Sequence, residues 1–315
     1  MSLTKQQSAN TLTKKLLLPL SNLGELLRHM HWKRFFRRLF KNTLMSLWMY
    51  PIAMFFAVIF GYPLVWMVYS SFKPTRELVK NVWALPTGVS FDNYRELIHN
   101  DTFLNYYQNN LIVVLVSVPL LTIIAAMAAF VFARIKFKGS NLLFYMFLAG
   151  TMIPVHVTLI PLYTMLRDLH WLNTLTALIV PFISFNLPVS IFILRDFFTK
   201  IPSELEDAAR VDGCSSARIF WSIMLPLARP AIATVVILSA VSAWNEYLFA
   251  LTFIGANNDA YTLPLGTLSM VSALGITHFD RMFSVLTMAT LPILAFYFLA
   301  QREIIKGITA GAVKG

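Results

Sequence analysis

The chain has 315 residues, of which 57% are apolar and 13% are charged, with a net charge of +11 and a mean hydropathy of +0.64. Soluble domains carry about 25% charged residues, so this composition excludes a water-soluble enzyme of this size and indicates a membrane protein with several spans. In such a protein a basic net charge first suggests lysine and arginine gathered on cytoplasmic loops. The single cysteine, Cys214, excludes an internal disulfide framework and a metal site of several cysteines.

The first 44 residues form a basic tail. Its apolar run, residues 16–20, is too short for a secretory signal peptide. Residues 31–41, HWKRFFRRLFK, combine aromatic and cationic side chains directly before the first long apolar stretch. This pattern is typical of an interfacial helix that lies on anionic membrane lipids. Binding of nucleic acid or of a regulatory partner is the alternative, and no other feature of the sequence supports it, so we expect no nucleic-acid partner.

Long apolar stretches bounded by charges predict the membrane-spanning helices, each of about 20 residues, the length that crosses the hydrocarbon core. Six such stretches follow the tail, at residues 45–69, 110–133, 142–165, 172–194, 231–254 and 283–300. We therefore expect an all-α membrane protein with six transmembrane helices in one domain, residues 45–315.

The distribution of basic residues predicts the orientation of these spans. Twenty lysines and arginines fall in the tail, in the connections 134–141 and 195–230, and after residue 300, whereas six fall in the alternate connections. Basic loops stay in the cytoplasm. The alternation predicts that both termini are cytoplasmic and agrees with an even number of crossings.

The connection 195–230 has the composition of a soluble helical hairpin. Pro202 precedes a capping box, in which the Ser203 hydroxyl would accept from the Glu206 amide and the Glu206 carboxylate would reach back to the Ser203 amide. The first helix should therefore begin at Ser203. Gly213 is placed to end this helix in the left-handed conformation.

A second helix is expected directly after this glycine. Ser215 or Ser216 can cap its start. It should run to Leu225, where Pro226 stops it. A helix, a glycine turn and a second helix would form a compact knob outside the membrane.

This hairpin resembles the EAA motif of ABC importer permeases, which reads EAA, three residues, glycine, nine residues and IxLP. The matching residues are Asp207, Ala208, Ala209, Gly213, Ile223, Leu225 and Pro226. Asp207 stands where the family usually has glutamate, which shortens the reach of the carboxylate, and the neighbouring Glu206 is a substitute for it.

The resemblance implies the type I ABC importer permease fold, with this hairpin as a coupling helix in a cleft of a separate ATPase subunit. Leu205, Ile219 and Phe220 would then be apolar anchors in the interface. The sequence has no GxxxxGK[ST] loop to bind phosphates, so ATP and Mg²⁺ would be used by the partner, and this chain is expected to be no enzyme and to bind no cofactor or metal. An amphipathic hairpin folded back on its own bundle is the alternative.

Three further segments are similar to carbohydrate ABC importer permeases of the maltose-permease type, namely residues 152–163, 242–251 and 301–315. This similarity covers residues 45–315. It implies a bacterial inner-membrane location and three kinds of partner: a second, different permease subunit, two copies of an ATPase and an extracytoplasmic sugar-binding protein. It also implies contact between the end of the C-terminal tail, GITAGAVKG at residues 307–315, and the ATPases, with a disordered tail as the alternative.

Polar side chains within the predicted spans are candidates for a translocation pathway, because they are costly in lipid unless they face a cavity or each other. Glu246 is the only acidic residue inside a predicted span, and it lies among Trp244, Asn245 and Tyr247. This group could contact sugar hydroxyls and ring faces, or it could fasten its helix to neighbouring helices, and we favour fastening. The same two alternatives apply to residues His156 and Asn186.

The segment 73–109 carries as many acidic as basic residues and predicts a short turn and an amphipathic helix outside the membrane. It would touch the binding protein or pack on the bundle as a lid.

Other classes of function are less compatible with the sequence. A permease of the same type for a polyol or a glycerol phosphate would share the hairpin motif. A secondary transporter would need paired intramembrane acids or internal repeats, and the sequence shows neither. It also shows no constellation of nucleophile, base or metal ligands for a membrane enzyme.

Overall fold

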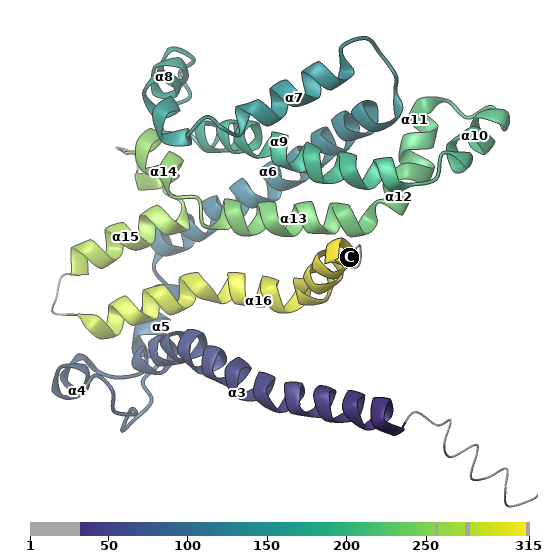
Figure 1. Cartoon of the computed structure of the whole chain (residues 1–315). Coiled ribbons are helices and arrows are strands. Elements are labelled where there is room, and N and C mark those ends of the chain that lie inside the picture. The colour runs from purple at the N-terminus through teal and green to yellow at the C-terminus, as the bar shows by residue number, and fades with distance from the viewer. Residues whose placement is uncertain (1–31, 256–257, 275–277, 313–315) are drawn as a thin grey trace, which may run out of the picture. The chain divides into compact units, whose positions relative to one another are not determined.

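The computed structural model describes residues 32–255, 258–274 and 278–312, and every regular element within these ranges is a helix (Figure 1). The chain divides into two compact units, residues 1–65 and residues 66–315. The predicted tail, residues 1–44, lies largely outside the described ranges, and the predicted domain division after it stays a prediction.

Helix α3, Trp32–Ser70, forms the described part of the first unit and continues into the second. It is one helix of 39 residues that includes Pro51 and Pro63. The described part of HWKRFFRRLFK continues without a break into the first span; its position on the lipid surface stays a prediction, and His31 lies outside the described residues. The apolar side chains from Leu47 to Val65 are almost all exposed, as expected of a helix that faces lipid.

The second unit contains the remaining elements. The first half holds α4 (Thr75–Lys80), α5 (Asp92–Ile98), α6 (Asp101–Arg134), α7 (Ser140–Gly150), α8 (Val155–Asp168) and α9 (Thr176–Lys200). The second half holds α10 (Glu204–Val211), α11 (Ser216–Ile219), η1 (Phe220–Met224), α12 (Leu225–Leu227), α13 (Arg229–Trp244), α14 (Leu248–Phe253), η2 (Asn258–Ala260), α15 (Leu263–Leu274) and α16 (Phe279–Ala312).

Four helices are long and apolar enough to cross a membrane, or up to six spans if each of two bent helix pairs counts as one. The four are Leu47–Ser70, Asp101–Arg134, Thr176–Lys200 and Phe279–Phe298, and they match the predicted first, second, fourth and sixth spans. The sequence therefore predicts the positions of these four correctly.

The predicted third and fifth spans are not single helices. Residues 142–165 fall on α7 and α8, which are bent by 96° at Pro154. Proline lacks an N–H and disfavours a helical conformation in the residue before it, and this ends α7 before the predicted span is complete. Residues 231–254 fall on α13 and α14, which are separated at residues 245–247. Helix α13 is also bent by 76° from the segment Ser216–Leu227.

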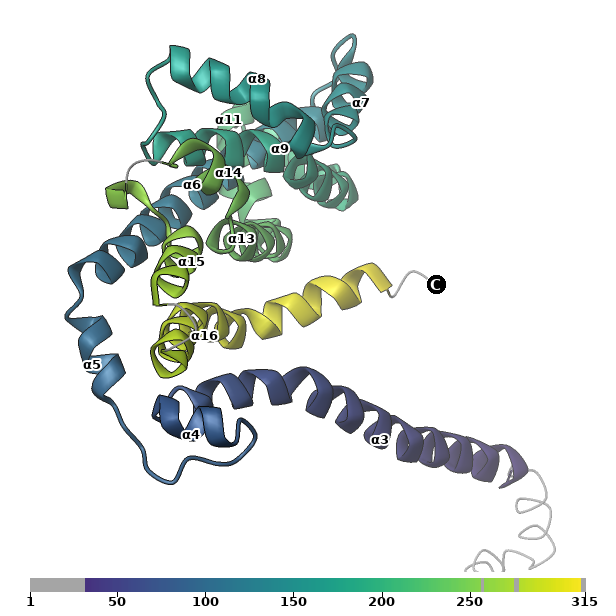
Figure 2. The ribbon, with the colours of Figure 1, turned by 90° about the vertical axis from the view of Figure 1, so that its left-hand side faces the viewer.

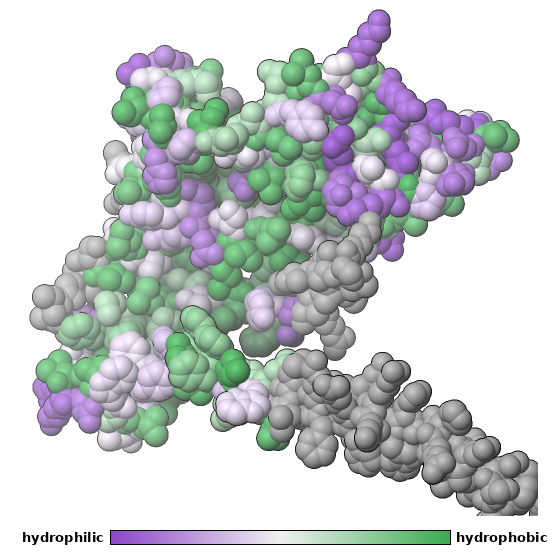
Figure 3. Space-filling view, viewed as in Figure 1, coloured by the Kyte–Doolittle hydropathy of each residue, from purple (hydrophilic) through white to green (hydrophobic). Residues whose placement is uncertain are grey.

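The centre of the second unit is the pair α6 and α9, against which α13 packs (Figures 1 and 2). Small side chains on α6, such as Ala125 and Ala129, are fully buried in this contact. Without a large side chain between them, two helices in a membrane approach closely and gain van der Waals contact. Figure 3 shows the result on the surface: apolar residues cover the helix faces, while polar residues gather over α10 and the adjoining helix ends.

Helices α4 and α5 pack against the start of α16. Thr75 donates a hydrogen bond to Asp280, Arg281 forms a 3.0 Å ion pair with Glu96, and the Ser284 hydroxyl donates to the Ser71 carbonyl over 3.1 Å. The short turn and helix predicted for residues 73–109 are thus confirmed as elements. These contacts fit the alternative in which the segment packs on the bundle.

Two elements differ from the predictions near the C-terminus. Helix α15, Leu263–Leu274, was not predicted, because its 12 residues are too few for a span. Helix α16 continues to Ala312, so the described part of the predicted C-terminal tail is helical. Contact of this segment with an ATPase stays a prediction.

Candidate functional site

The hairpin between α9 and α13 begins one residue later than predicted and without a capping box. Helix α10 starts at Glu204, and Ser203 has helical backbone angles with no hydrogen bond to its side chain. Its carbonyl, rather than its hydroxyl, accepts from the amides of Glu206 and Asp207. A capping serine needs an extended backbone to reach the amides. The capping-box prediction was therefore wrong. The Glu206 carboxylate pairs with two arginines instead.

The turn at Gly213 is confirmed. Its φ of +79° lies in the left-handed region, and the Gly213 and Cys214 amides donate to the carbonyls of Arg210 and Ala209. These bonds satisfy carbonyls at the end of α10. A side chain added at Gly213 would meet no atom within 4 Å, so the backbone angle alone explains the glycine.

The second helix of the hairpin begins as predicted but ends later. Ser215, one of the two predicted caps, accepts from the Arg218 amide. The helix widens into the π-turn η1 and continues through Pro226 to Leu227. The predicted stop at Pro226 was wrong, because the proline lies in the first turn of α12, where a missing N–H costs little. The sharp bend follows instead at Ala228.

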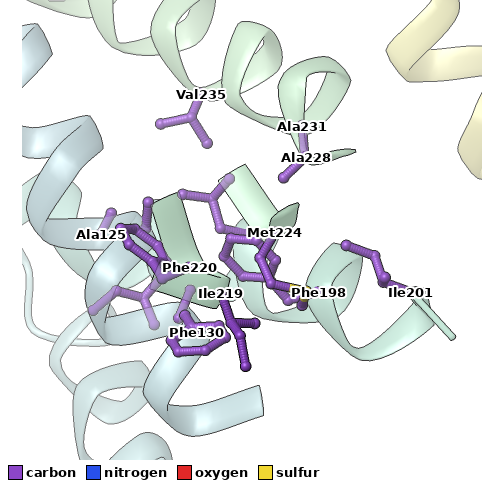
Figure 4. Packing of buried hydrophobic residues seen from close by; sticks show 14 of the residues in the cluster. Ala125, Phe130, Phe198, Ile201, Ile219, Phe220, Met224, Ala228, Ala231 and Val235 are labelled. Atoms are coloured by element: carbon purple, nitrogen blue, oxygen red, sulfur yellow. The ribbon is translucent and has the colours of Figure 1, made fainter. Parts of the chain in front are cut away.

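The inner side of the hairpin is part of the bundle's core (Figure 4). Ile219 and Phe220 are fully buried there, and the Phe130 ring lies 5.3 Å from that of Phe220 and 6.2 Å from that of Phe198. Ile219 and Phe220 were predicted to anchor a partner. They instead fix the hairpin to α6 and α9, and Ala209 is buried with them.

Two arginines hold the Glu206 side chain, which is 10% exposed. Its carboxylate lies 2.7 Å from Arg210 Nη2 and 3.9 Å from Arg134 Nε. Arg134, the last residue of α6, also donates to the carbonyls of Phe198 and Ile201 at the end of α9. One arginine thus joins the ends of α6 and α9 to the hairpin.

The outer side of the hairpin exposes the other part of the motif. Asp207, Ala208, Gly213 and Pro226 are exposed, and Ile223 and Leu225 are half-buried. Two further apolar residues face outward, Leu205 at 44% and Val211 at 88% exposure. The predicted docking residues therefore divide into an outer surface and an inner contact formed by Glu206 and Ala209.

The second group of predicted site residues lies at the break between α13 and α14. The Glu246 carboxylate accepts from the amides of Phe249, over 2.6 Å, and Ala250, over 3.2 Å. It thereby satisfies two amides at the start of α14 that have no helical partner. This is a local cap within one segment of the chain, so the pathway and fastening interpretations of Glu246, and of Tyr247, which precedes α14 directly, stay predictions.

The other two residues of that group border a cavity of about 320 Å³ between α13, α15 and α16. Trp244 and Asn245 form the end of α13, and Thr267 and Thr290 face them from α15 and α16. The Asn110 side chain donates to the Trp244 carbonyl over 3.3 Å. A mainly apolar cavity, with Asn245, Thr267 and Thr290 as its polar residues, thus lies at the end of α13.

The remaining predicted pathway residues are elsewhere. His156 is exposed in the first turn of α8, and the Asn186 amide donates to the Phe182 carbonyl within α9. Neither lines the cavity. Sequence reasoning missed Arg134, which it counted only as a basic loop residue, and Thr267, which lies on the helix it did not predict.

A family model described as the inner membrane component of binding-protein-dependent transport systems matches residues 120–309. This range includes the whole hairpin and the break between α13 and α14.

Several curated proteins are similar to this chain over most of their own length. The putative ABC transporter permease protein ORF2 of Caldicellulosiruptor sp. (strain Rt8B.4) is 40% identical over 85% of this chain and 97% of its own. The trehalose transport system permease protein SugB of Mycobacterium tuberculosis is 35% identical over 80% and 92%. The arabinooligosaccharides transport system permease protein AraQ of Bacillus subtilis is 32% identical over 83% and 93%.

Among solved structures, a chain of a bacterial ABC transporter that imports the acidic polysaccharide alginate superposes with a TM-score of 0.73. It is 20% identical, and the match covers 83% of this chain and 97% of that one. The two chains share their fold.

Proposed function

Since the chain belongs to the family of inner membrane components of binding-protein-dependent transport systems, we propose that it is one permease subunit of an ATP-driven importer for a sugar or oligosaccharide. The membership makes the chain a multi-pass transport component. The carbohydrate cargo is supported by relatives whose names specify trehalose and arabinooligosaccharides.

The assembly in this proposal contains a second, different permease subunit, two copies of an ATPase and an extracytoplasmic sugar-binding protein. ATP and Mg²⁺ bind to the ATPase, because this sequence has no phosphate-binding loop of its own. Both termini and the hairpin of α10 to α12 lie in the cytoplasm, which is supported by the excess of twenty basic residues over six on that side.

The proposal rests mainly on the hairpin, which has an exposed outer surface and an inner side that is buried in the bundle. Its outer surface presents Leu205, Ala208 and Val211 beside the acidic Asp207. Exposed apolar side chains next to a small residue permit close docking of a partner, and such side chains dominate interface energies. The ATPase binds this surface.

The inner side of the hairpin connects the docked ATPase to the central helices of the bundle. Displacement of α10 is transmitted through Glu206 to Arg134, which holds the ends of α6 and α9. These are the two helices with the largest mutual contact in the second unit. Closure of the ATPases on ATP therefore moves the central helices and switches the pathway between its inward-facing and outward-facing states.

Two substitutions on the outer surface test the docking. Val211→Asp and Ala208→Arg place a charge at exposed positions, so the permease should fold normally but retain less than a tenth of the ATPase in a pull-down from membranes that contain both. Val79→Asp is the matched control, because Val79 is 69% exposed on α4, far along the chain from the hairpin.

Undiminished retention of the ATPase by both hairpin variants, together with normal ATP-driven sugar uptake, would contradict the docking surface. Retained docking with no uptake of any neutral or acidic sugar would contradict the carbohydrate cargo instead.

A further inference from the structure

The connection between α6 and α7 forms an open hollow at the end of a membrane span. The hollow has a volume of about 490 Å³ and is lined by residues 132–138 together with Ser140 and Asn141. Helix α6 is long and apolar enough to cross a membrane, and α7 is the first half of a bent pair that would form another span. The hollow therefore lies where a transmembrane bundle meets the polar surface of the bilayer, at the same end as the hairpin of α10 to α12 (Figure 1).

The described lining of the hollow is basic. It includes Arg134, Lys136 and Lys138. Arg134 pairs with Glu206, whereas Lys136 and Lys138 are exposed and form no ion pair with a described residue. Directly after them α7 begins at Ser140, with no side-chain cap and no acidic residue in its first turn. Two lysines beside the positive end of a helix dipole favour an anionic ligand.

One wall of the hollow is aromatic and is fixed to the bundle. Phe132 and Phe137 line the hollow, with their ring centroids 6.4 Å apart, and the Phe132 ring also packs on that of Phe144 at 5.9 Å. Arg195 of α9 lies over the Phe144 ring at 3.9 Å, and its Nε donates to the Phe132 carbonyl over 3.4 Å. This wall is therefore held by α9 and does not depend on the connection alone.

An exposed apolar surface adjoins the hollow. Leu142, Tyr145 and Met146 follow on α7 at helical spacing, and they are 67%, 64% and 62% exposed. Side chains three and four positions apart share one face of a helix. A ligand that fits both surfaces has an anionic group for the lysines and an apolar part for this face of α7.

We propose that the hollow binds the headgroup of an anionic phospholipid, with its phosphate between Lys136 and Lys138 and its acyl chains along the exposed face of α7. Charge complementarity and continuity with the bilayer both favour this ligand, because basic pockets at the ends of membrane helices attract anionic headgroups. A free phosphate ion would use the lysines only. The site goes beyond the proposed function, since it does not depend on the cargo.

The test measures lipid binding to the full-length chain in a neutral detergent by native mass spectrometry. The probes are dioleoyl phosphatidylglycerol and dioleoyl phosphatidylcholine, which share their acyl chains and differ in net charge. The wild type should bind phosphatidylglycerol more tightly. Lys136→Gln combined with Lys138→Gln should weaken that binding about 25-fold, since each basic residue near an anionic headgroup contributes about fivefold, and should leave phosphatidylcholine binding unchanged. Lys136→Arg combined with Lys138→Arg keeps both charges and should keep the preference.

Arg218→Gln combined with Arg229→Gln is the matched control. Both arginines are exposed, belong to the connection 195–230 and do not line the hollow. This variant loses the same net charge at the same end of the bundle, and its affinity for phosphatidylglycerol should equal that of the wild type.

Equal affinities of the wild type for the two lipids, or an unchanged affinity in the double glutamine variant of Lys136 and Lys138, would overturn the site. An equal loss of affinity in the control variant would also overturn it, because the attraction would then belong to the whole basic end of the bundle. Displacement of phosphatidylglycerol by millimolar inorganic phosphate would assign the hollow to a free anion instead. Loss of ATPase retention by the double glutamine variant, with lipid binding unchanged, would assign it to a protein partner. None of these outcomes bears on the cargo, which sugar uptake tests separately.

Discussion

Arg134 and Glu206 form an ion pair between the end of α6 and the hairpin of α10 to α12, with 3.9 Å between Arg134 Nε and Glu206 Oε2 and side chains only 11% and 10% exposed. Arg134 donates at the same time to two carbonyls at the end of α9. The pair is therefore the polar link between the hairpin's inner side and the two central helices of the bundle.

Removal of the Glu206 charge should destabilise the permease. Glu206→Gln leaves Arg134 buried without its anionic partner, which costs about 3 kcal/mol for a pair of this kind. The midpoint of thermal unfolding in detergent, measured without the ATPase, should fall, while Asp207→Asn at the exposed neighbouring position should leave it unchanged.

A double-mutant cycle separates this pair from other contacts. Glu206→Leu combined with Arg134→Met should be less destabilising than the sum of the two single changes, because neither charge is then left alone. Strict additivity would show that the two residues do not interact.

Gly213→Ala should weaken the hairpin turn. The left-handed conformation costs a residue with a Cβ about 1–2 kcal/mol, and no neighbouring atom adds to that cost at Gly213. Gly213→Asn should be milder, because asparagine tolerates this conformation better than alanine. Limited proteolysis within residues 204–227 measures the effect, and Gly88→Ala, which also meets no atom within 4 Å, should cause no change.

Gly266→Ala should destabilise the contact between α15 and α6 more strongly. A Cβ at Gly266 would overlap the ring of Tyr106, which is buried, and overpacking of this kind typically costs about 1–3 kcal/mol. Combination with Tyr106→Leu should recover part of the lost thermal stability. If Gly266→Ala unfolds at the same temperature as the wild type, α15 does not pack on Tyr106 as described.

Cys214 reports on the side of the membrane that the hairpin faces. It is the only cysteine in the sequence and is half-buried just after Gly213. A membrane-impermeant maleimide should label it in inside-out vesicles and not in right-side-out vesicles. Asp212→Cys in a Cys214→Ser background supplies an exposed thiol at the same place, and labelling of that variant only from the outside would reverse the predicted orientation.

Low pH should weaken the hydrogen bonds that hold the loop after α4. Hydrogen bonds from the Thr87 hydroxyl and amide to the Glu77 carboxylate lower the pKa of Glu77 below its ordinary value of 4.5. The stabilisation is present above pH 4.5 and is lost as the pH falls through the lowered pKa. Protection of the Thr87 amide from hydrogen exchange should fall in that acidic window, after correction for the intrinsic rate, whereas Glu77→Gln should show no such step.

The linear sequence was sufficient to locate the features that depend on local chemistry. Four spans follow from runs of apolar residues, the left-handed turn from Gly213 and the cap of the second helix from Ser215, because hydropathy and backbone preference act over a few neighbouring residues. The motif from Asp207 to Pro226 likewise identified the family by its spacing alone.

Which side each motif residue faces was decided only by the tertiary structure. Ile219, Phe220 and Ala209 have the composition of an interface, yet they pack on α6 and α9, and Glu206 binds Arg134, 72 positions earlier, instead of the Ser203 amide. The cap that Glu246 forms at the start of α14 is local, with partners three and four residues away, but the cavity beside it depends on α15 and α16. Arg134, Ile219 and Phe220 acquire their roles from partners that are distant in the sequence, which residue preferences over a few neighbouring positions do not specify.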